Sequence, residues 1–229
     1  MLISAGSVLG VVGLTAGVWE WVASAPERAQ AQFDSGSRLM TPGAYGEAVK
    51  RFDRAVAISP HLAGAYYERG VAHHLLGDAD AAINDLSRAI AEDPNYGEAY
   101  TERASILLER GSHDRGNLER ALADFTHAVE VEPSANGFYQ RGQTYASLGQ
   151  PDKAIADFDR AIAESPNSPY IYRARAEAKR SLGDMAGYQA DRDFAIRSEY
   201  GGAPPAWVDQ PLPGDRNQES AVSSQKSEK

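Results

Sequence analysis

The amino-acid sequence repeats itself at a period of about 34 residues. The phrases AVAISP, AIAEDP, AVEVEP and AIAESP end at Pro60, Pro94, Pro133 and Pro166, so successive copies are 34, 39 and 33 residues apart. Two series of alanines keep the same steps: Ala48, Ala82, Ala121, Ala154 and Ala55, Ala89, Ala128, Ala161. A chain with this period folds as a stack of similar units, and a stack offers a binding surface rather than a catalytic cleft.

Composition narrows the class of protein. A hydrophobic content of 42% is enough for a packed core. The net charge of −9 argues against nucleic acid as a partner, because phosphates bind to basic surfaces. The sequence has no cysteine, which excludes a disulfide framework, a thiolate zinc site and a thiol nucleophile. Abundant alanine without strand-forming runs predicts helices throughout.

The unit at residues 63–96 shows the pattern of two antiparallel helices. Small and aromatic residues recur three or four positions apart in each half, as they do on one face of a helix. Between the halves, Gly77 suits a turn and Asp78 can cap the second helix. Pro94 then prevents the second helix from continuing and starts the next unit.

These residues resemble the tetratricopeptide repeat family, whose unit runs aromatic, small, aromatic, then Ala, Phe, Ala and Pro. Three units match in this order: Tyr66, Gly70, His73, Ala82, Leu86, Ala89, Pro94; Tyr100, Ala104, Leu107, Ala121, Phe125, Ala128, Pro133; and Phe138, Gly142, Tyr145, Ala154, Phe158, Ala161, Pro166. The first unit lacks the leading aromatic, and the last has Tyr188 and Arg192 where Ala and an aromatic belong. Such departures are expected of terminal units.

The resemblance covers roughly residues 29–200 and implies an all-α fold, an α-solenoid of about five antiparallel helix–turn–helix hairpins. We expect the solenoid at residues 26–200, in units of about 29–62, 63–96, 97–134, 135–168 and 169–200. Residues 201–229 are rich in Pro, Gly and small polar residues, which predicts a disordered tail. Three interpretations of Trp207 in this tail stay open: it packs over the last helix, it binds a partner as part of a short motif, or it faces solvent.

The 39-residue step has a local cause. Gly77 and Ala82 are 5 residues apart, whereas Gly111 and Ala121 are 10 apart, so five residues are inserted at SHDRGNLE, residues 112–119. We expect a longer loop between the two helices of that unit. Such a loop either has no function or contacts a partner.

Charged residues keep the same register. Arginines recur in the first halves and aspartates in the second halves of four units: Arg69, Arg103, Arg141, Arg175 and Asp85, Asp124, Asp157, Asp191. Their separations are 16, 21, 16 and 16, so the pairs follow the insertion. We predict Arg–Asp contacts within or between hairpins, with a structural rather than a ligand-binding role.

Residue types that carry catalysis are not grouped along the chain. None of the five histidines belongs to a metal-ligand pattern, and the sequence has no GxSxG, HExxH or phosphate-loop motif. We therefore expect no enzyme activity, no cofactor and no metal site.

The resemblance also implies where a ligand binds, since the first helices of tetratricopeptide proteins line a concave groove for peptides or helices. By their offsets, the groove residues are Tyr67, Val71, His74, Thr101, Ser105, Leu108, Tyr139, Gln143, Arg173, Glu177 and Arg180. We expect an aromatic and polar groove with a basic end at Arg173 and Arg180. The Lys and Asn set with which one subgroup grips a C-terminal carboxylate is missing. Alternatively, these residues only pack or face solvent.

Residues 2–19 carry no charge and would span about 27 Å as a helix, close to the thickness of a bilayer core. Their glycines fall on one helix face, a pattern typical of packing between membrane helices: Gly6, Gly10, Gly13 and Gly17. Three interpretations of residues 1–25 stay open: an uncleaved anchor, a signal peptide cleaved near Ala25, and a buried or misassigned start.

These observations predict a membrane-tethered interaction scaffold that binds a peptide or protein, with the repeats on the extracytoplasmic (periplasmic) side. The arginines after the segment, Arg28 and Arg38, favour the opposite side by the positive-inside rule. One alternative is an assembly subunit of a membrane protein complex, held through the glycine-striped helix. Another is a secreted or periplasmic adaptor that has lost its signal peptide. Neither nucleic acid nor a small-molecule substrate is expected.

Overall fold

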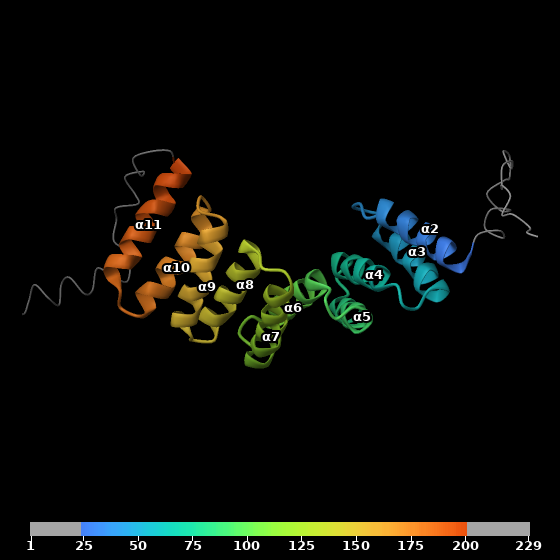
Figure 1. Cartoon of the computed structure of the whole chain (residues 1–229), viewed down its shortest axis with the longest axis horizontal. Helices are drawn as coiled ribbons and strands as arrows, with labels where there is room; N and C mark the ends of the chain where they lie inside the picture. Colours follow the sequence, from blue (N-terminus) through green and yellow to red (C-terminus); the bar gives the residue numbers. More distant parts are fainter. Residues whose placement is uncertain (1–23, 201–229) are drawn as a thin grey trace, which may run out of the picture. The chain divides into compact units, whose positions relative to one another are not determined.

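A computed structural model describes residues 24–200, and every regular element in that range is an α-helix (Figure 1). The helices are α2 (Ala25–Arg38), α3 (Tyr45–Ile58), α4 (Ala63–Leu75), α5 (Ala79–Glu92), α6 (Gly97–Gly111), α7 (Arg115–Val131), α8 (Ala135–Ser147), α9 (Pro151–Glu164), α10 (Pro169–Ser181) and α11 (Met185–Tyr200). Each even-numbered helix packs against the next one to form five hairpins. The predicted all-α fold of helical hairpins is confirmed for this range.

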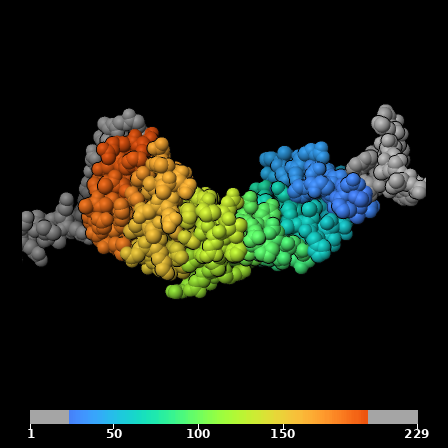
Figure 2. Space-filling model, viewed as in Figure 1, coloured from blue at the N-terminus to red at the C-terminus, as the bar shows by residue number. Residues whose placement is uncertain are grey.

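The chain divides into two compact units, unit 1 up to Pro133 and unit 2 from Ser134. In unit 1, α3 packs on α4 and α5 packs on α6, so three hairpins contact one another in chain order. The space-filling view shows these hairpins, coloured blue to green, against one another (Figure 2). In unit 2, α9 packs on α10 and joins the last two hairpins. The repeat bounds expected from the sequence stay a prediction.

The alanines and aromatic residues that recur with the repeat form the hydrophobic core of the hairpins. Both alanine series are buried, and Phe52, Phe125 and Phe158 are at most 1% exposed. Glycine lets the first helix approach these rings closely: a Cβ on Gly36 would lie 2.6 Å from the Phe52 ring. A Cβ on Gly142 would lie 2.7 Å from the Phe158 ring. Close packing of the two helices in a hairpin therefore depends on the small residue of the repeat.

The turns between paired helices use a left-handed glycine in four of the five hairpins: Gly43, Gly77, Gly149 and Gly183. Gly77 has a φ of 84°, and its N–H donates to the His74 carbonyl at 2.8 Å. The next N–H, of Asp78, donates to the His73 carbonyl at 2.9 Å, which completes a Schellman C-cap. The Asp78 carboxylate accepts from the Ala81 N–H at 3.0 Å and caps α5. The roles predicted for Gly77 and Asp78 are confirmed.

The five inserted residues do not form a longer loop, so that prediction is wrong. Only residues 112–114 separate α6 from α7, as residues 76–78 separate α4 from α5. The insertion instead lengthens the helices: α6 has 15 residues against 13 in α4, and α7 has 17 against 14 in α5. The Asp114 carboxylate accepts from the Asn117 N–H at 2.8 Å, and this cap starts α7 early.

The prediction of a membrane-anchored, extracytoplasmic chain is corrected by the helices of residues 24–200. None of them is long and apolar enough to cross a bilayer. The longest, α7, has 17 residues and carries charged side chains along its length, whereas a spanning helix needs about 20 predominantly apolar residues. Residues 2–19 with Gly6, Gly10, Gly13 and Gly17 lie outside the described residues, as do the tail and Trp207.

Candidate functional site

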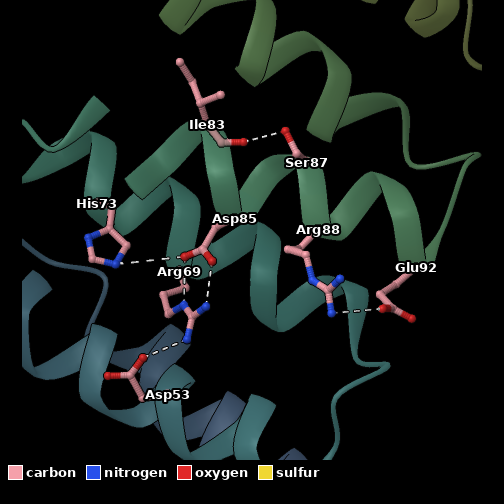
Figure 3. Close-up of polar contacts among 8 residues, drawn as sticks. All are labelled: Asp53, Arg69, His73, Ile83, Asp85, Ser87, Arg88 and Glu92. Atoms are coloured by element: carbon pink, nitrogen blue, oxygen red, sulfur yellow. Dashed lines mark hydrogen bonds and ion pairs between the residues drawn. The ribbon is translucent and has the colours of Figure 1, made fainter. Parts of the chain in front are cut away.

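The predicted Arg–Asp pairs form within the hairpins. Arg69 on α4 donates two hydrogen bonds to the Asp85 carboxylate on α5, at 2.7 and 2.6 Å (Figure 3). Three further hairpins repeat this bidentate contact at 2.6 to 2.9 Å: Arg103–Asp124, Arg141–Asp157 and Arg175–Asp191. All four aspartates are buried. Each pair fixes the first helix of a hairpin to the second, as expected of a structural contact.

Arg69, Arg103 and Arg175 also contact the hairpin before their own. The third guanidinium nitrogen of Arg69, Nη1, donates to Asp53 on α3 at 2.8 Å (Figure 3). Arg103 reaches the Ser87 hydroxyl on α5 at 2.9 Å in the same way, and Arg175 reaches Asp159 on α9 at 2.5 Å. The prediction of contacts within or between hairpins is therefore confirmed in both forms.

The last hairpin adds a lysine to its pair. Lys179 lies 2.9 Å from the Asp191 carboxylate, on the turn of α10 after Arg175. Burial acts to raise the pKa of Asp191, but the hydrogen bonds from Arg175 and Lys179 outweigh burial and hold this pKa below its ordinary value. Asp191 therefore stabilises the fold above the ordinary aspartate pKa, and this contribution is lost as the pH falls through the lowered value.

In unit 1, the expected groove residue Tyr67 lies against Tyr96, a residue that the sequence did not single out. Their ring centroids are 5.0 Å apart. Burial raises the pKa of each hydroxyl to about 12, and nearby glutamates act in the same direction. For Tyr67 these glutamates are Glu102, Glu68 and Glu98. Half-buried aromatic rings and carboxylates thus meet on the first-helix side of α4 and α6.

Two of these glutamates have no ion-pair partner among the contacts of residues 24–200. Glu68 is partly buried, and burial alone raises its pKa. Glu98 is exposed in the first turn of α6. Neither glutamate belongs to the repeated Arg–Asp pattern, so sequence periodicity offered no reason to select them.

His74 is the expected groove residue with the most definite contacts. Its Nδ1 lies 2.8 Å from Glu102 Oε1, and its Nε2 lies 2.7 Å from Glu109 Oε2. Both glutamates belong to α6, so His74 joins two neighbouring first helices. The sequence offered no signal for these partners, because they lie 28 and 35 residues away.

The other expected groove residues of unit 1 have smaller roles. Thr101 and Ser105 donate their hydroxyls to carbonyls one turn back on α6, those of Gly97 and Thr101. Val71 is partly buried, and Leu108 packs against the buried cluster around Phe125. Their places in a ligand groove stay a prediction.

In unit 2, each of the two arginines expected to form the basic end of the groove lies beside a carboxylate. Arg173 pairs with Glu199 of α11. Arg180 pairs with Glu177 at 2.7 Å, and Glu177 is itself one of the expected groove residues. Both arginines therefore have a carboxylate beside them, and neither offers an uncompensated positive charge.

The aromatic part of unit 2 lies on α8. Tyr139 packs edge-on against Tyr170, with ring centroids 4.9 Å apart. Its hydroxyl oxygen accepts a hydrogen bond from the exposed Gln143 amide at 2.6 Å.

Residues 24–200 contain no group of three His, Asp or Glu side chains placed to hold a metal ion.

Comparisons with known proteins agree with this geometry. Family descriptions of the tetratricopeptide repeat match residues 63–96 and 135–168, and a TPR repeat description matches residues 36–77. The solved structure of TTC0263, a thermophilic TPR protein of Thermus thermophilus, is 30% identical, covers 74% of this chain and 91% of its own, and superposes with a TM-score of 0.53. The chain belongs to the tetratricopeptide repeat family.

Other solved structures share the fold at lower identity. MamA superposes with a TM-score of 0.66 at 20% identity, over 72% of this chain and 95% of that one. YrrB, described as a TPR protein with an unusual peptide-binding site, gives 0.68 at 17% identity, over 80% and 91%. Hsc70-interacting protein 1 of Drosophila melanogaster is 27% identical over 103 residues, which is 44% of this chain. The match spans about a quarter of that relative's length, 27%.

Proposed function

We propose that this tetratricopeptide repeat chain is an interaction scaffold that binds a peptide or protein on the first-helix side of its hairpins. Family membership supports a binding role, and YrrB is a member of this fold with a peptide-binding site. We propose no catalytic role, because the charged pairs recur with the repeat as structural contacts do.

One observation points to the kind of partner. On the first-helix side of α4 and α6, the tilted rings of Tyr67 and Tyr96 lie near the partly buried Glu68 and the exposed Glu98, and neither glutamate has a cation partner among the contacts of residues 24–200. A half-buried carboxylate without a cation raises the free energy of the fold, and a bound cation removes this penalty. Aromatic rings also attract cations to their faces. We therefore propose a partner segment that presents Lys or Arg side chains to Tyr67, Tyr96 and these glutamates.

Peptide binding tests this proposal. Synthetic peptides of about twelve residues, with sequences of increasing Lys and Arg content, are titrated into the full chain and the affinity is measured by calorimetry. We expect affinity to rise with basic content and to fall at least about tenfold in the double variant Glu68→Gln, Glu98→Gln, about 1.4 kcal/mol. The matched control is the double variant Glu119→Gln, Glu130→Gln, which removes the same charge from two exposed glutamates of the second helix α7 and should bind as the unmodified chain does.

Two results would contradict the proposal. If acidic peptides bind as well as basic ones, the carboxylates do not select the partner. If Glu119→Gln, Glu130→Gln weakens binding as much as Glu68→Gln, Glu98→Gln, the effect comes from the net charge of the chain rather than from the first-helix side.

A further inference from the structure

The imidazole of His74 lies between two carboxylates of the neighbouring hairpin. Glu102 and Glu109 are seven residues apart, which places them two turns apart on one face of α6. The side chains of His74 and Glu102 are 24% and 28% exposed, whereas Glu109 is 62% exposed. A single side chain on α4 therefore contacts both ends of a two-turn stretch of α6.

The two contacts together require a charged ring. A neutral imidazole has one N–H donor and one nitrogen lone pair, whereas the imidazolium has two donors. With 2.8 and 2.7 Å between ring nitrogens and carboxylate oxygens, a neutral ring would turn a lone pair towards one of the two carboxylates. Both hydrogen bonds can form only when the ring carries its second proton.

We infer that His74 is a pH-dependent clasp: protonated, it joins hairpin α4–α5 to hairpin α6–α7, and deprotonated, it releases one of its two carboxylates. Electrostatics supports this geometry. Burial acts to lower the pKa of His74, but the hydrogen bonds to Glu102 and Glu109 outweigh burial and raise its pKa above the ordinary value of 6.5. The clasp therefore stabilises the contact below about pH 6.5 and is lost as the pH rises through the raised value.

The other charged groups around this end of α4 are engaged elsewhere. On α5 and at its start, Asp85 pairs with Arg69, and Asp78 caps the helix. Asp80 of α5 pairs with Arg110 of α6. His73, the neighbour of His74, turns to Asp85 at 3.9 Å (Figure 3). Only Glu102 and Glu109 act on the pKa of His74 as charges.

The clasp also regulates the proposed binding side, a consequence that rests on the proposed function. Glu102 lies close enough to Tyr67 for its charge to raise the pKa of that hydroxyl. While His74 is protonated, its positive charge compensates Glu102 and Glu109. When His74 loses the proton, this part of unit 1 becomes more negative, and a basic partner binds more tightly.

A histidine titration of the full chain by nuclear magnetic resonance tests the clasp without any partner. The chain has five histidines, and His74→Gln assigns the signal of His74. We expect His74 to titrate with a midpoint above about 6.5, the ordinary value of a histidine. The variant Glu109→Gln should lower the midpoint of His74. A His74 midpoint at or below about 6.5, or one that Glu109→Gln leaves unchanged, would overturn the clasp.

Thermal unfolding provides a second measurement. The unmodified chain should melt at a higher temperature than His74→Gln at about pH 6, and the difference should shrink as the pH is raised to about 9. A difference between the unmodified chain and His74→Gln that is the same at both pH values would contradict the clasp.

Peptide binding at the same two pH values separates the clasp from the proposed function. Lys-rich peptides should gain affinity between about pH 6 and about pH 9 with the unmodified chain and not with His74→Gln. An equal gain in both chains would overturn the regulatory role. Failure of every peptide to bind, with the histidine titration as expected, would contradict the proposed function and leave the clasp intact.

Discussion

At the scale of single residues, the repeated charges and His74 are organised differently. The Arg–Asp pairs join residues at a regular offset inside four hairpins, so the spacing of 16 residues, or 21 across the insertion, was sufficient to predict them. The contacts of His74 cross from one hairpin to the next and occur at one place in the described part of the chain. Their partners depend on how two first helices pack, and the sequence spacing contains no such information.

The Arg103–Asp124 pair should contribute measurably to stability. Asp124→Asn keeps the size of the side chain but removes its charge, and Arg103, whose side chain is 20% exposed, loses a bidentate charged contact. We expect a loss of about 2 kcal/mol, typical of hydrogen bonds to charged groups. Urea unfolding followed by circular dichroism measures the change as a lower midpoint.

An exposed ion pair provides the control for Asp124→Asn. Arg115 and Glu119 lie 2.8 Å apart with side chains 79% and 55% exposed, so Arg115→Gln should cost less than about 0.5 kcal/mol. Equal midpoints for the two variants would mean that the repeated pairs follow the repeat without stabilising it.

At the scale of helices, each hairpin depends on how closely its two helices approach. Gly142 on α8 lies against the buried ring of Phe158 on α9, and a Cβ there would meet the ring at 2.7 Å. We expect Gly142→Ala to destabilise unit 2, although alanine favours helix formation by about 1 kcal/mol over glycine. The size of the loss, typically about 1–3 kcal/mol for an overpacked core, is measured by urea unfolding.

Gly46 provides the matched control for Gly142. It lies in α3 with nothing within 4 Å of an added Cβ, so Gly46→Ala should leave stability unchanged or raise it. Hairpin α6–α7 already carries an alanine, Ala104, in one buried cluster with Phe125. If Gly142→Ala proves harmless, α8 and α9 can adjust as α6 and α7 do around that alanine.

The insertion shows what sequence offsets leave undecided about helices. The offsets showed that five additional residues lie between Gly111 and Ala121. They did not show whether these residues form a loop or extend the helices. The Asp114 cap decides this, because it starts α7 at Arg115 and leaves three residues for the turn. Helical hydrogen bonds satisfy the added peptide groups, whereas a longer loop would leave them to water.

At the scale of the whole molecule, the two compact units predict different stabilities for two fragments. Residues 24–133 contain three hairpins joined by two interfaces between neighbouring hairpins. Residues 134–200 contain two hairpins joined by one such interface. Since repeat stability grows with each interface between neighbours, the first fragment should fold and unfold cooperatively, and the second should melt at a lower temperature. Circular dichroism of the two separate fragments measures both properties. A higher melting temperature for residues 134–200 would contradict this prediction.

The sequence by itself determined the repeat, the helices, the turn at Gly77 and the Arg–Asp pairs, because these depend on spacing within one hairpin. Only the tertiary structure decided that the insertion lengthens α6 and α7, that carboxylates compensate Arg173 and Arg180, and that His74 meets Glu102 and Glu109. The contacts of Arg173 and His74 join residues from different helices, and their geometry follows from the rotation and depth at which the helices pack, whereas Arg180 meets Glu177 within α10. No period along the chain encodes that rotation, so periodicity predicts which residues form a hairpin but not which residues of two hairpins meet.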